Sequence, residues 1–379
     1  MQRPVYLDYN GTTPHDPEVI QAMRPFLDQE FGNPSSAHFY GHKPKAAVET
    51  ARRQVAQLLG CKPREIVFTS GGTESNNHAI RGIAGSMKSR GRHIITSTIE
   101  HPAVSEVCRF LEGDGFETTF VSVDGRGVVD MQKLRQAVRP DTILITIMHA
   151  NNEVGTIQPI AEIAEIAAAG DIAMHTDAAQ SVGKIVCDVR RLGVDLLSLA
   201  GHKLYAPKGV GALFVKQGVL PEKFCFGAGQ ESGWRAGTEN VLEIVGLGKA
   251  CEIAARDLEA NVEHMQAMRD RLHQGLVASL EDVRLNGHED QRLPNTLNLS
   301  FKALEADRIL DAIGDRVAAS AGAACHSSGV KLSHVLEAMQ VPEHWAKGTI
   351  RFSVGRMTTP EEIDQAIAIV AAAVSNLRS

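Results

Sequence analysis

Paired cysteines, blocks of like charge and long apolar runs are all missing from this chain of 379 residues. Its six cysteines lie far apart without a C-x-x-C pair, which indicates a reduced compartment and not a disulfide framework. The first ten residues, MQRPVYLDYN, lack the apolar core of a signal peptide. No apolar stretch approaches the roughly 20 residues that a membrane span needs. We therefore expect a cytoplasmic protein with no membrane partner.

The charge pattern gives equally little sign of a nucleic-acid partner. The net charge is −6, and residues of both signs are spread along the chain. A basic block, which is typical of proteins that bind nucleic acid or anionic membrane surfaces, is absent. With 43% hydrophobic residues the chain is long enough for a large core and for two or three domains.

Seven short apolar or β-branched runs alternate with helical patterns between about residues 60 and 215. A mainly parallel sheet with helices on both faces produces this alternation. The sequence therefore predicts an α/β fold whose large domain contains a mainly parallel seven-stranded sheet. The runs are REIVFTS (64–70), RHIITST (92–98), ETTFVSV (117–123), TILITIMHA (142–150), DIAMHTDA (171–178), DLLSLA (195–200) and VGALFV (210–215).

The pattern changes after about residue 240 to a long charged helix. Two weaker strand candidates follow at 295–301 and 348–354, and a closing helical pattern begins with PEEIDQAI. Such a change indicates a second, smaller α+β domain. We assign residues 15–255 to the large domain, and residues 1–14 and 256–379 to the small domain.

Polar clusters follow five of the predicted strands. In FTSGGTESNN (68–77), Thr73 is positioned to cap a helix whose free N–H groups would form an anion cradle. Each cluster alone also fits a plain turn or an ordinary surface residue. Because ligands of open α/β sheets collect at the carboxyl ends of the strands, we interpret the clusters together as one site. The others are STIEHP (97–102), MHANNEVG (148–155), HTDAAQ (175–180) and GHKLYAPKG (201–209).

Lys203 and Asp177 suggest a cofactor for this site. An amine at the rim of the sheet with a carboxylate on the neighbouring strand suits pyridoxal phosphate, since the amine bonds the aldehyde and the carboxylate keeps the ring nitrogen protonated. Gly201 would let the backbone approach the cofactor closely. A dinucleotide enzyme is the competing α/β interpretation, but no G-x-G-x-x-G opens a helix after a strand.

Nine motifs in order resemble those of the cysteine desulfurases, pyridoxal-phosphate enzymes of the class V aminotransferase group. The resemblance covers residues 6–356 and implies the type I fold of pyridoxal-phosphate-dependent transferases. The motifs are YLDYNGTTP (6–14), FGNPSSAH (31–38), TSGGTESNN (69–77), HANNEVGTIQP (149–159), HTDAAQSVGK (175–184), GHKLYAPKGVGALFV (201–215), GQESGWRAGTEN (229–240), GAACHSSG (322–329) and IRFSVGR (350–356).

The resemblance implies cofactor roles for several residues. Lys203 would hold pyridoxal phosphate, Asp177 would face the ring nitrogen, His101 would stack on the ring and Gln180 would hydrogen-bond the ring hydroxyl. The phosphate would be held by a further group of residues, the last of them supplied by the other subunit of a homodimer. That group is Gly72, Thr73, His202 and Thr238.

Substrate roles are implied in the same way. Arg351, Asn152 and Asn10 would bind the substrate, with the planar guanidinium of Arg351 on its carboxylate, and Asn152 would also contact the cofactor. Cys325 matches the sulfur-accepting cysteine. Lys203 and His101 would move protons. No metal is implied.

The sequence departs from the family at two positions and indicates a branch. Gly11 stands where alanine is commoner, and Ala200 stands where many members have a phosphate-binding serine, which removes one hydroxyl donor. The 26 residues from Cys325 to Arg351 resemble the branch with a long cysteine loop, which serves iron–sulfur cluster assembly. The small side chains of AASAGAACHSSG favour mobility of that loop.

The implied activity is conversion of L-cysteine to L-alanine, with a persulfide left on Cys325 for a sulfur-acceptor or scaffold protein. Selenocysteine lyase is an alternative, because it shares GHKLYAPK, GQESGWRAGTEN and GAACHSSG. A non-catalytic scaffold subunit of a sulfur-transfer assembly is a second alternative. Its mark would be loss of the lysine or the cysteine, and both are present.

Overall fold

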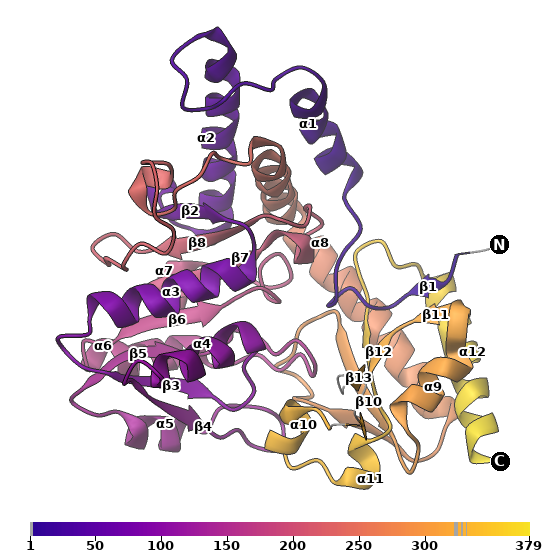
Figure 1. The fold of residues 1–379 in the computed structure, drawn as a ribbon. Coiled ribbons are helices and arrows are strands. Elements are labelled where there is room, and N and C mark those ends of the chain that lie inside the picture. The colour runs from indigo at the N-terminus through magenta and orange to yellow at the C-terminus, as the bar shows by residue number, and fades with distance from the viewer. Residues whose placement is uncertain (1–2, 322–324, 327–328, 331) are drawn as a thin grey trace.

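A seven-stranded sheet forms the centre of the larger part of the molecule (Figure 1). The computed structural model describes residues 3–321, 325–326, 329–330 and 332–379. The sheet order is β2-β8-β7-β6-β5-β3-β4. Strand β8 is antiparallel to both of its neighbours, β2 and β7, and the other neighbouring pairs are parallel. All seven predicted strands are confirmed, as β2 (Ile66–Thr69), β3 (His93–Ser97), β4 (Glu117–Val121), β5 (Thr142–Thr146), β6 (Ala173–Asp177), β7 (Leu196–Ala200) and β8 (Gly211–Val215).

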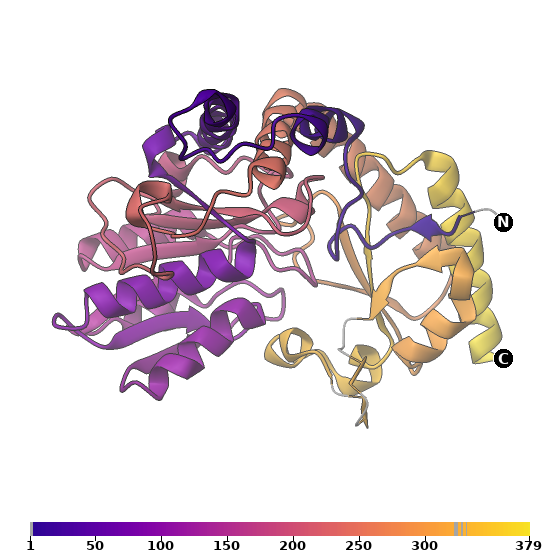
Figure 2. The same ribbon diagram turned by 45° about the horizontal axis from the view of Figure 1, so that its top comes forward.

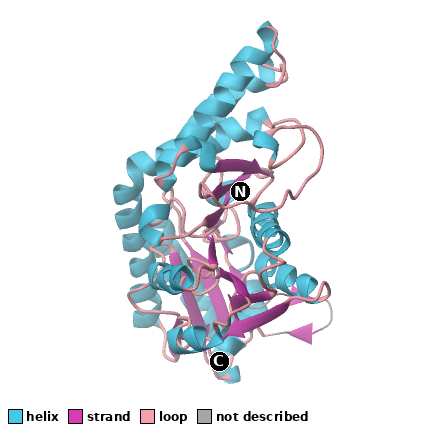
Figure 3. Ribbon diagram, turned by 90° about the vertical axis from the view of Figure 1, so that its left-hand side faces the viewer, coloured by secondary structure: helices cyan, strands magenta, loops and turns pink. Residues whose placement is uncertain are grey.

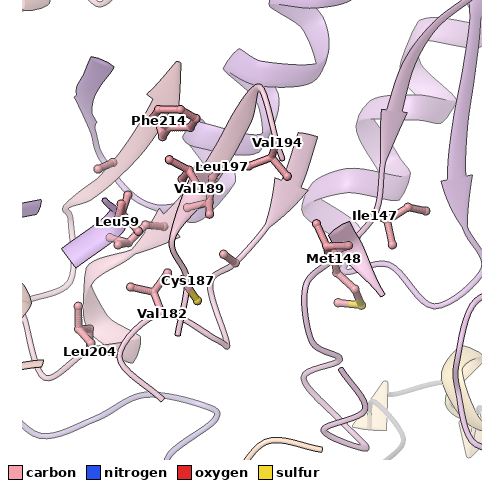
Figure 4. Packing of buried hydrophobic residues seen from close by; sticks show 14 of the residues in the cluster. Leu59, Ile147, Met148, Val182, Cys187, Val189, Val194, Leu197, Leu204 and Phe214 are labelled. Carbon is pink, nitrogen blue, oxygen red and sulfur yellow. The ribbon is translucent and has the colours of Figure 1, made fainter. Parts of the chain in front are cut away.

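Helices bury both faces of this sheet, and the strands are apolar on both faces for that reason. Ile94 and Leu196 pack with α3 and α4, whereas their chain neighbours Ile95 and Leu197 pack with α2, α6 and α8. This is the period of two that strand geometry imposes. Figure 4 shows part of the core that contains Leu197 and lies on the α2, α6 and α8 side of the sheet. The helices of this part are α1 (Pro17–Asp28), α2 (Phe39–Leu59), α3 (Gly72–Ser86), α4 (Pro102–Glu112), α5 (Met131–Ala137), α6 (Ile160–Ala169) and α7 (Val189–Leu192).

A four-stranded antiparallel sheet forms the centre of the smaller part, on the right of Figure 2. Phe301 and Phe352 are fully buried in its core. The N-terminal strand β1 (Val5–Tyr6) also belongs here, because it pairs with β11 (Val317–Ala318). The sheet order is β12 (Ser320–Ala321), β15 (Thr349–Ser353), β10 (Thr296–Phe301) and β9 (Val283–Asn286). The smaller part also contains α9 (Ala306–Ile313), α11 (Glu343–Ala346) and α12 (Pro360–Arg378).

The 39-residue helix α8 (Val241–Ser279) connects the two parts. Its first half, up to Ala254, packs in the core of the large sheet, and its second half, from Met265, packs in the core of the small one. The predicted boundary at residue 255 falls between these halves and stays a prediction. Helix α10 (His334–Ala338) packs through Val335 against the large core, although it lies within the range assigned to the small domain.

The remaining elements are short connections. They are the two-stranded ribbon β13 (Cys325–His326) and β14 (Gly329–Val330), and the one-turn helices η1 (Pro63–Glu65), η2 (Gly201–Lys203), η3 (Glu231–Gly233) and η4 (Gly314–Arg316). Helix α2 projects from the top of the molecule in Figures 1 and 3. Among the described residues, no helix combines the length and apolar character needed to cross a membrane.

Candidate active site

A cavity of about 310 Å³ opens at the carboxyl ends of β6 and β7 and at the N-terminus of α3. It gathers ten of the twelve residues that the sequence analysis assigned to the site. The small part contributes one of them from β15, and the N-terminal segment contributes another. The ten are Asn10, Gly72, Thr73, His101, Asn152, Asp177, Gln180, His202, Lys203 and Arg351.

Lys203 ends the single helical turn η2 that follows β7. Its Nζ donates to the backbone carbonyls of Asn10 and Gly11, the latter at 2.7 Å. Burial lowers the pKa of Lys203 to about 8, and the charge of Arg351 acts in the same direction. A large fraction of this amine is therefore neutral near pH 8, which is the form that attacks a carbonyl.

Gly201 lies where the turn η2 packs against the segment that leads into β8. A Cβ at this position would lie 2.9 Å from the backbone oxygen of Val210, and Gly201 does not line the cavity. The glycine therefore allows η2 to pack against the start of β8, and the expectation of a close approach to a cofactor stays a prediction.

Asp177, the last residue of β6, has both carboxylate oxygens fixed. Asn76 Nδ2 donates to Oδ2 at 2.7 Å, and the backbone N–H of Ala179 donates to Oδ1 at 2.9 Å. The two donors hold the carboxylate in one orientation in this buried position. Sequence reasoning missed Asn76. Asn76 could have been recognised because it lies three residues after Thr73. In a helix that begins at Gly72, this spacing places both residues on the same side.

The N-terminus of α3 opens into the cavity without a side-chain cap. Gly71, with φ +152°, is the N-cap residue, and Thr73 lies in the first turn, so the prediction that Thr73 caps the helix is wrong. The free N–H groups of this 15-residue helix form a site for an anion. A Cβ at Gly72 would lie 3.2 Å from the Ala200 Cβ, so glycine lets the helix approach β7 closely.

Two histidines border the cavity in their neutral form. His101 is the N-cap of α4, where Nδ1 accepts a hydrogen bond of 3.1 Å from the Ala103 N–H, so the ring proton of the neutral form lies on Nε2. Partial burial lowers the pKa of His101, and Lys203 lowers it further. Burial and nearby lysines lower the pKa of His202 to about 4, and its Nδ1 lies 3.2 Å from Thr12 Oγ1.

Arg351 brings a guanidinium into the cavity from the small part. Its Nη2 forms a 2.6 Å ion pair with Asp8, and its Nη1 donates to the carbonyl of Asn152 at 3.2 Å. The buried Nε has no hydrogen-bond partner among the described residues. Asp8, which the sequence analysis did not single out, lies in the motif YLDYN and is placed here by its bridge with Ser353. The arrangement fits a carboxylate ligand.

Two predicted residues remain, Thr238 and Cys325, and Thr238 does not line the cavity. Thr238 is exposed in the segment between η3 and α8. Cys325 lies in β13, which pairs with β14, but its side chain is outside the described part of the chain. The catalytic assignment of Cys325 and the inter-subunit role of Thr238 stay predictions.

Residues 5–366 match the family model of the aminotransferase class V proteins, nearly the whole chain. The chain belongs to the aminotransferase class V family. It is 48% identical to a protein of Dictyoglomus turgidum named cysteine desulfurase IscS, with 100% of this chain and 96% of the relative aligned. A protein of the same name from Methanosarcina thermophila is also 48% identical, over 99% of this chain and 93% of its own length.

The class V assignment agrees with the fold. A solved structure titled NifS-like protein superposes with a TM-score of 0.93 at 38% identity, covering 99% of this chain and 100% of that one. The matched range includes both sheets and every cavity residue described above. In one cavity, this chain therefore brings together one amine, one fixed carboxylate, one open helix N-terminus and one guanidinium.

Proposed function

We propose that this chain is a pyridoxal-phosphate-dependent cysteine desulfurase. In the overall reaction, L-cysteine and the thiol of Cys325 give L-alanine and a Cys325 persulfide. The substrate C–S bond breaks, an S–S bond forms on the enzyme, and the substrate carbon gains a proton. The single observation that carries the proposal is that Lys203 and Asp177 line the same cavity, in a chain whose relatives are named cysteine desulfurase.

The donor set fits pyridoxal phosphate. The uncapped N-terminus of α3, with Thr73 and His202 beside it, suits the phosphate, and the Nζ of Lys203 suits the aldehyde. The Asp177 carboxylate suits a protonated ring nitrogen. Hydrogen bonds from Asn76 and Ala179 already hold its two oxygens in one orientation. When bound, this cofactor withdraws electrons from the α-carbon of an amino acid attached to it.

The residues of the chain then carry the remaining tasks. Arg351 binds the substrate carboxylate through its free Nε and the fork that now holds Asp8. Lys203, with its lowered pKa, takes and returns the α-proton. His101 donates or accepts through Nε2, because Nδ1 is engaged by Ala103. Cys325 accepts the sulfur and passes it to an acceptor protein.

Replacement of Cys325 tests the proposal directly. In Cys325→Ala we expect loss of alanine release and of persulfide labelling, while the visible absorption of the bound cofactor persists. Cys225→Ala is the matched control, because Cys225 is an exposed free cysteine and should leave alanine release unchanged. Normal alanine release by Cys325→Ala would refute the assigned nucleophile. A purified protein that stays colourless with added pyridoxal phosphate would refute the cofactor.

We further propose that the active unit is a homodimer in which Thr238 enters the partner's site. Thr238 is exposed, and its segment is anchored at its start by the buried Glu231–Arg52 pair and by the Arg235–Glu74 pair. Exposed aromatic rings such as Phe226 also favour an interface.

Mixed dimers test this arrangement. A dimer of one Lys203→Ala and one Thr238→Ala subunit retains one intact site if Thr238 acts across the interface. We then expect activity to rise when the two inactive or impaired proteins are mixed under exchange conditions. If Thr238 acts within its own subunit, mixing restores nothing.

A further inference from the structure

Lys184 is a buried amine close to the cavity that the mechanism above does not use. Only 4% of its surface is exposed, and it follows Gly183, whose φ of +76° turns the chain inward. Its Nζ donates to the backbone oxygen of Gln180 at 3.0 Å and to Oε1 of the same residue at 3.2 Å. Among the described residues no carboxylate forms an ion pair with it. A buried ammonium without a carboxylate is costly and needs a reason.

The contact with Gln180 fixes the direction of an amide. Because the Lys184 Nζ donates to this side chain, it selects the oxygen end of the Gln180 amide. The NH₂ end is thereby turned to the other side, where Nε2 donates to the carbonyl of Asn10 at 3.1 Å. Lys203 donates to the same carbonyl. One amide thus connects the buried Lys184 to the atom that holds the reactive amine.

Neither Cys187, which interacts with Lys184, nor its neighbour His149 supplies a charge at this position. Cys187 Sγ lies 3.6 Å from His149 Nδ1. Burial raises the pKa of Cys187 to about 12 and lowers that of His149 to about 4, so both are neutral at pH 7. Burial, Lys203 and Arg351 lower the pKa of Lys184 to about 7. An anion that enters the cavity would favour the charged form of Lys184.

We propose that Lys184 is a positioning residue that acts through Gln180: it turns the amide NH₂ toward the cavity and stabilises the anionic form of the hydroxyl on the bound cofactor. This inference rests on the proposed function. If the anionic hydroxyl is stabilised, the proton on the Lys203 nitrogen should dissociate at lower pH.

A pH titration of the visible absorption of the loaded enzyme tests the inference. Lys184→Met keeps the length and apolar stem of the side chain but removes charge and donors. We expect its titration midpoint to move to higher pH, with the acid dissociation constant about tenfold smaller. Lys88→Met, at an exposed position on the C-terminal side of α3, is the matched control and should titrate like the unsubstituted protein.

Gln180→Leu shows whether Lys184 acts through the amide. We expect this variant to raise the midpoint too, and the double variant with Lys184→Met to shift it by less than the sum of the two single shifts. Lys184→Gln provides a second neutral side chain in case methionine disturbs the fold.

The failures are distinguishable. A midpoint that stays unchanged in Lys184→Met or in Lys184→Gln, with the cofactor bound, overturns the inference and leaves the proposed function intact. A lower thermal midpoint without a titration shift also overturns it, because that result describes a structural role only. Absence of any visible band in the unsubstituted protein overturns the proposed function and this inference together.

Discussion

Asn76 and Asp177 are joined by a 2.7 Å hydrogen bond that ties the second turn of α3 to the end of β6. The Asn76 amide is fully buried, and its Oδ1 has no partner among the described residues. A buried amide that uses only its donor end on a carboxylate serves mainly to hold that carboxylate in place.

Replacement of Asn76 should therefore affect catalysis more than folding. We expect Asn76→Ala to lower kcat about 10- to 100-fold, since a hydrogen bond to a charged group contributes about 1.5–3 kcal/mol. Asn77→Ala is the matched control on the same helix, because Asn77 Nδ2 donates only to the Thr73 carbonyl at the surface. Initial rates of alanine release measure both. Equal rates in the two variants would contradict the role of Asn76.

Substrate capture should depend on the shape of the Arg351 guanidinium. In Arg351→Lys the point charge remains, but the planar fork and the free Nε are lost. We expect the KM for L-cysteine to rise about 10-fold or more with a smaller change in kcat, as expected when ground-state binding is removed. Steady-state kinetics over a wide cysteine range separate the two constants. A fall in kcat at unchanged KM would place Arg351 elsewhere in the reaction.

Uptake of pyridoxal phosphate by the cofactor-free protein should rise with pH. The pKa of Lys203 is lowered to about 8, so its amine is mostly charged below that pH and neutral above it. We expect the rate of appearance of the visible band to increase about tenfold between pH 7 and pH 9. Arg351→Ala should move the midpoint to higher pH, because Arg351 lowers the pKa of Lys203, and Asp8→Asn should move it to lower pH, because Asp8 raises it. Shifts of opposite sign would refute this account.

Stability should depend strongly on one buried ion pair. Both guanidinium Nη atoms of Arg52 contact Glu231 at 2.7 Å, and the Phe68 N–H donates to the same carboxylate at 2.8 Å. Glu231→Ala removes the buried carboxylate and leaves Arg52 with only the half-exposed Glu49 as an ion-pair partner, and we expect the free energy of unfolding to fall by about 3–5 kcal/mol.

A surface pair provides the comparison for this variant. Arg271 and Asp364 also form a short pair, but about half of each side chain is exposed. Asp364→Ala should therefore cost less than about 1 kcal/mol. Urea denaturation of both variants with the cofactor bound measures the difference, and similar losses would contradict the importance of burial.

The large sheet could be predicted because each strand is a continuous apolar or β-branched run. TILIT in β5, for example, is buried at all five positions. The two-residue strands β1 and β11 gave no such signal, since they pair across more than 300 residues of sequence. A period of two cannot be recognised in two residues.

The site was predicted less completely, for two physical reasons. Its residues come together from β6, β7, α3, β15 and the N-terminal segment, and only the family resemblance linked the more distant ones. Local geometry then decided details that composition cannot give. Gly71, and not Thr73, caps α3, and Gly201 is required where the chain passes Val210.

Helix α8 gives the molecule a mechanical property. It is uninterrupted for 39 residues, about 58 Å at the usual rise, and each half is buried in a different core. Unfolding of either core would expose the apolar face of the half of α8 that this core buries. The other half of the helix would then lose the support of a folded continuation. The two cores should therefore lose their structure together, in one cooperative step, even though each has its own sheet.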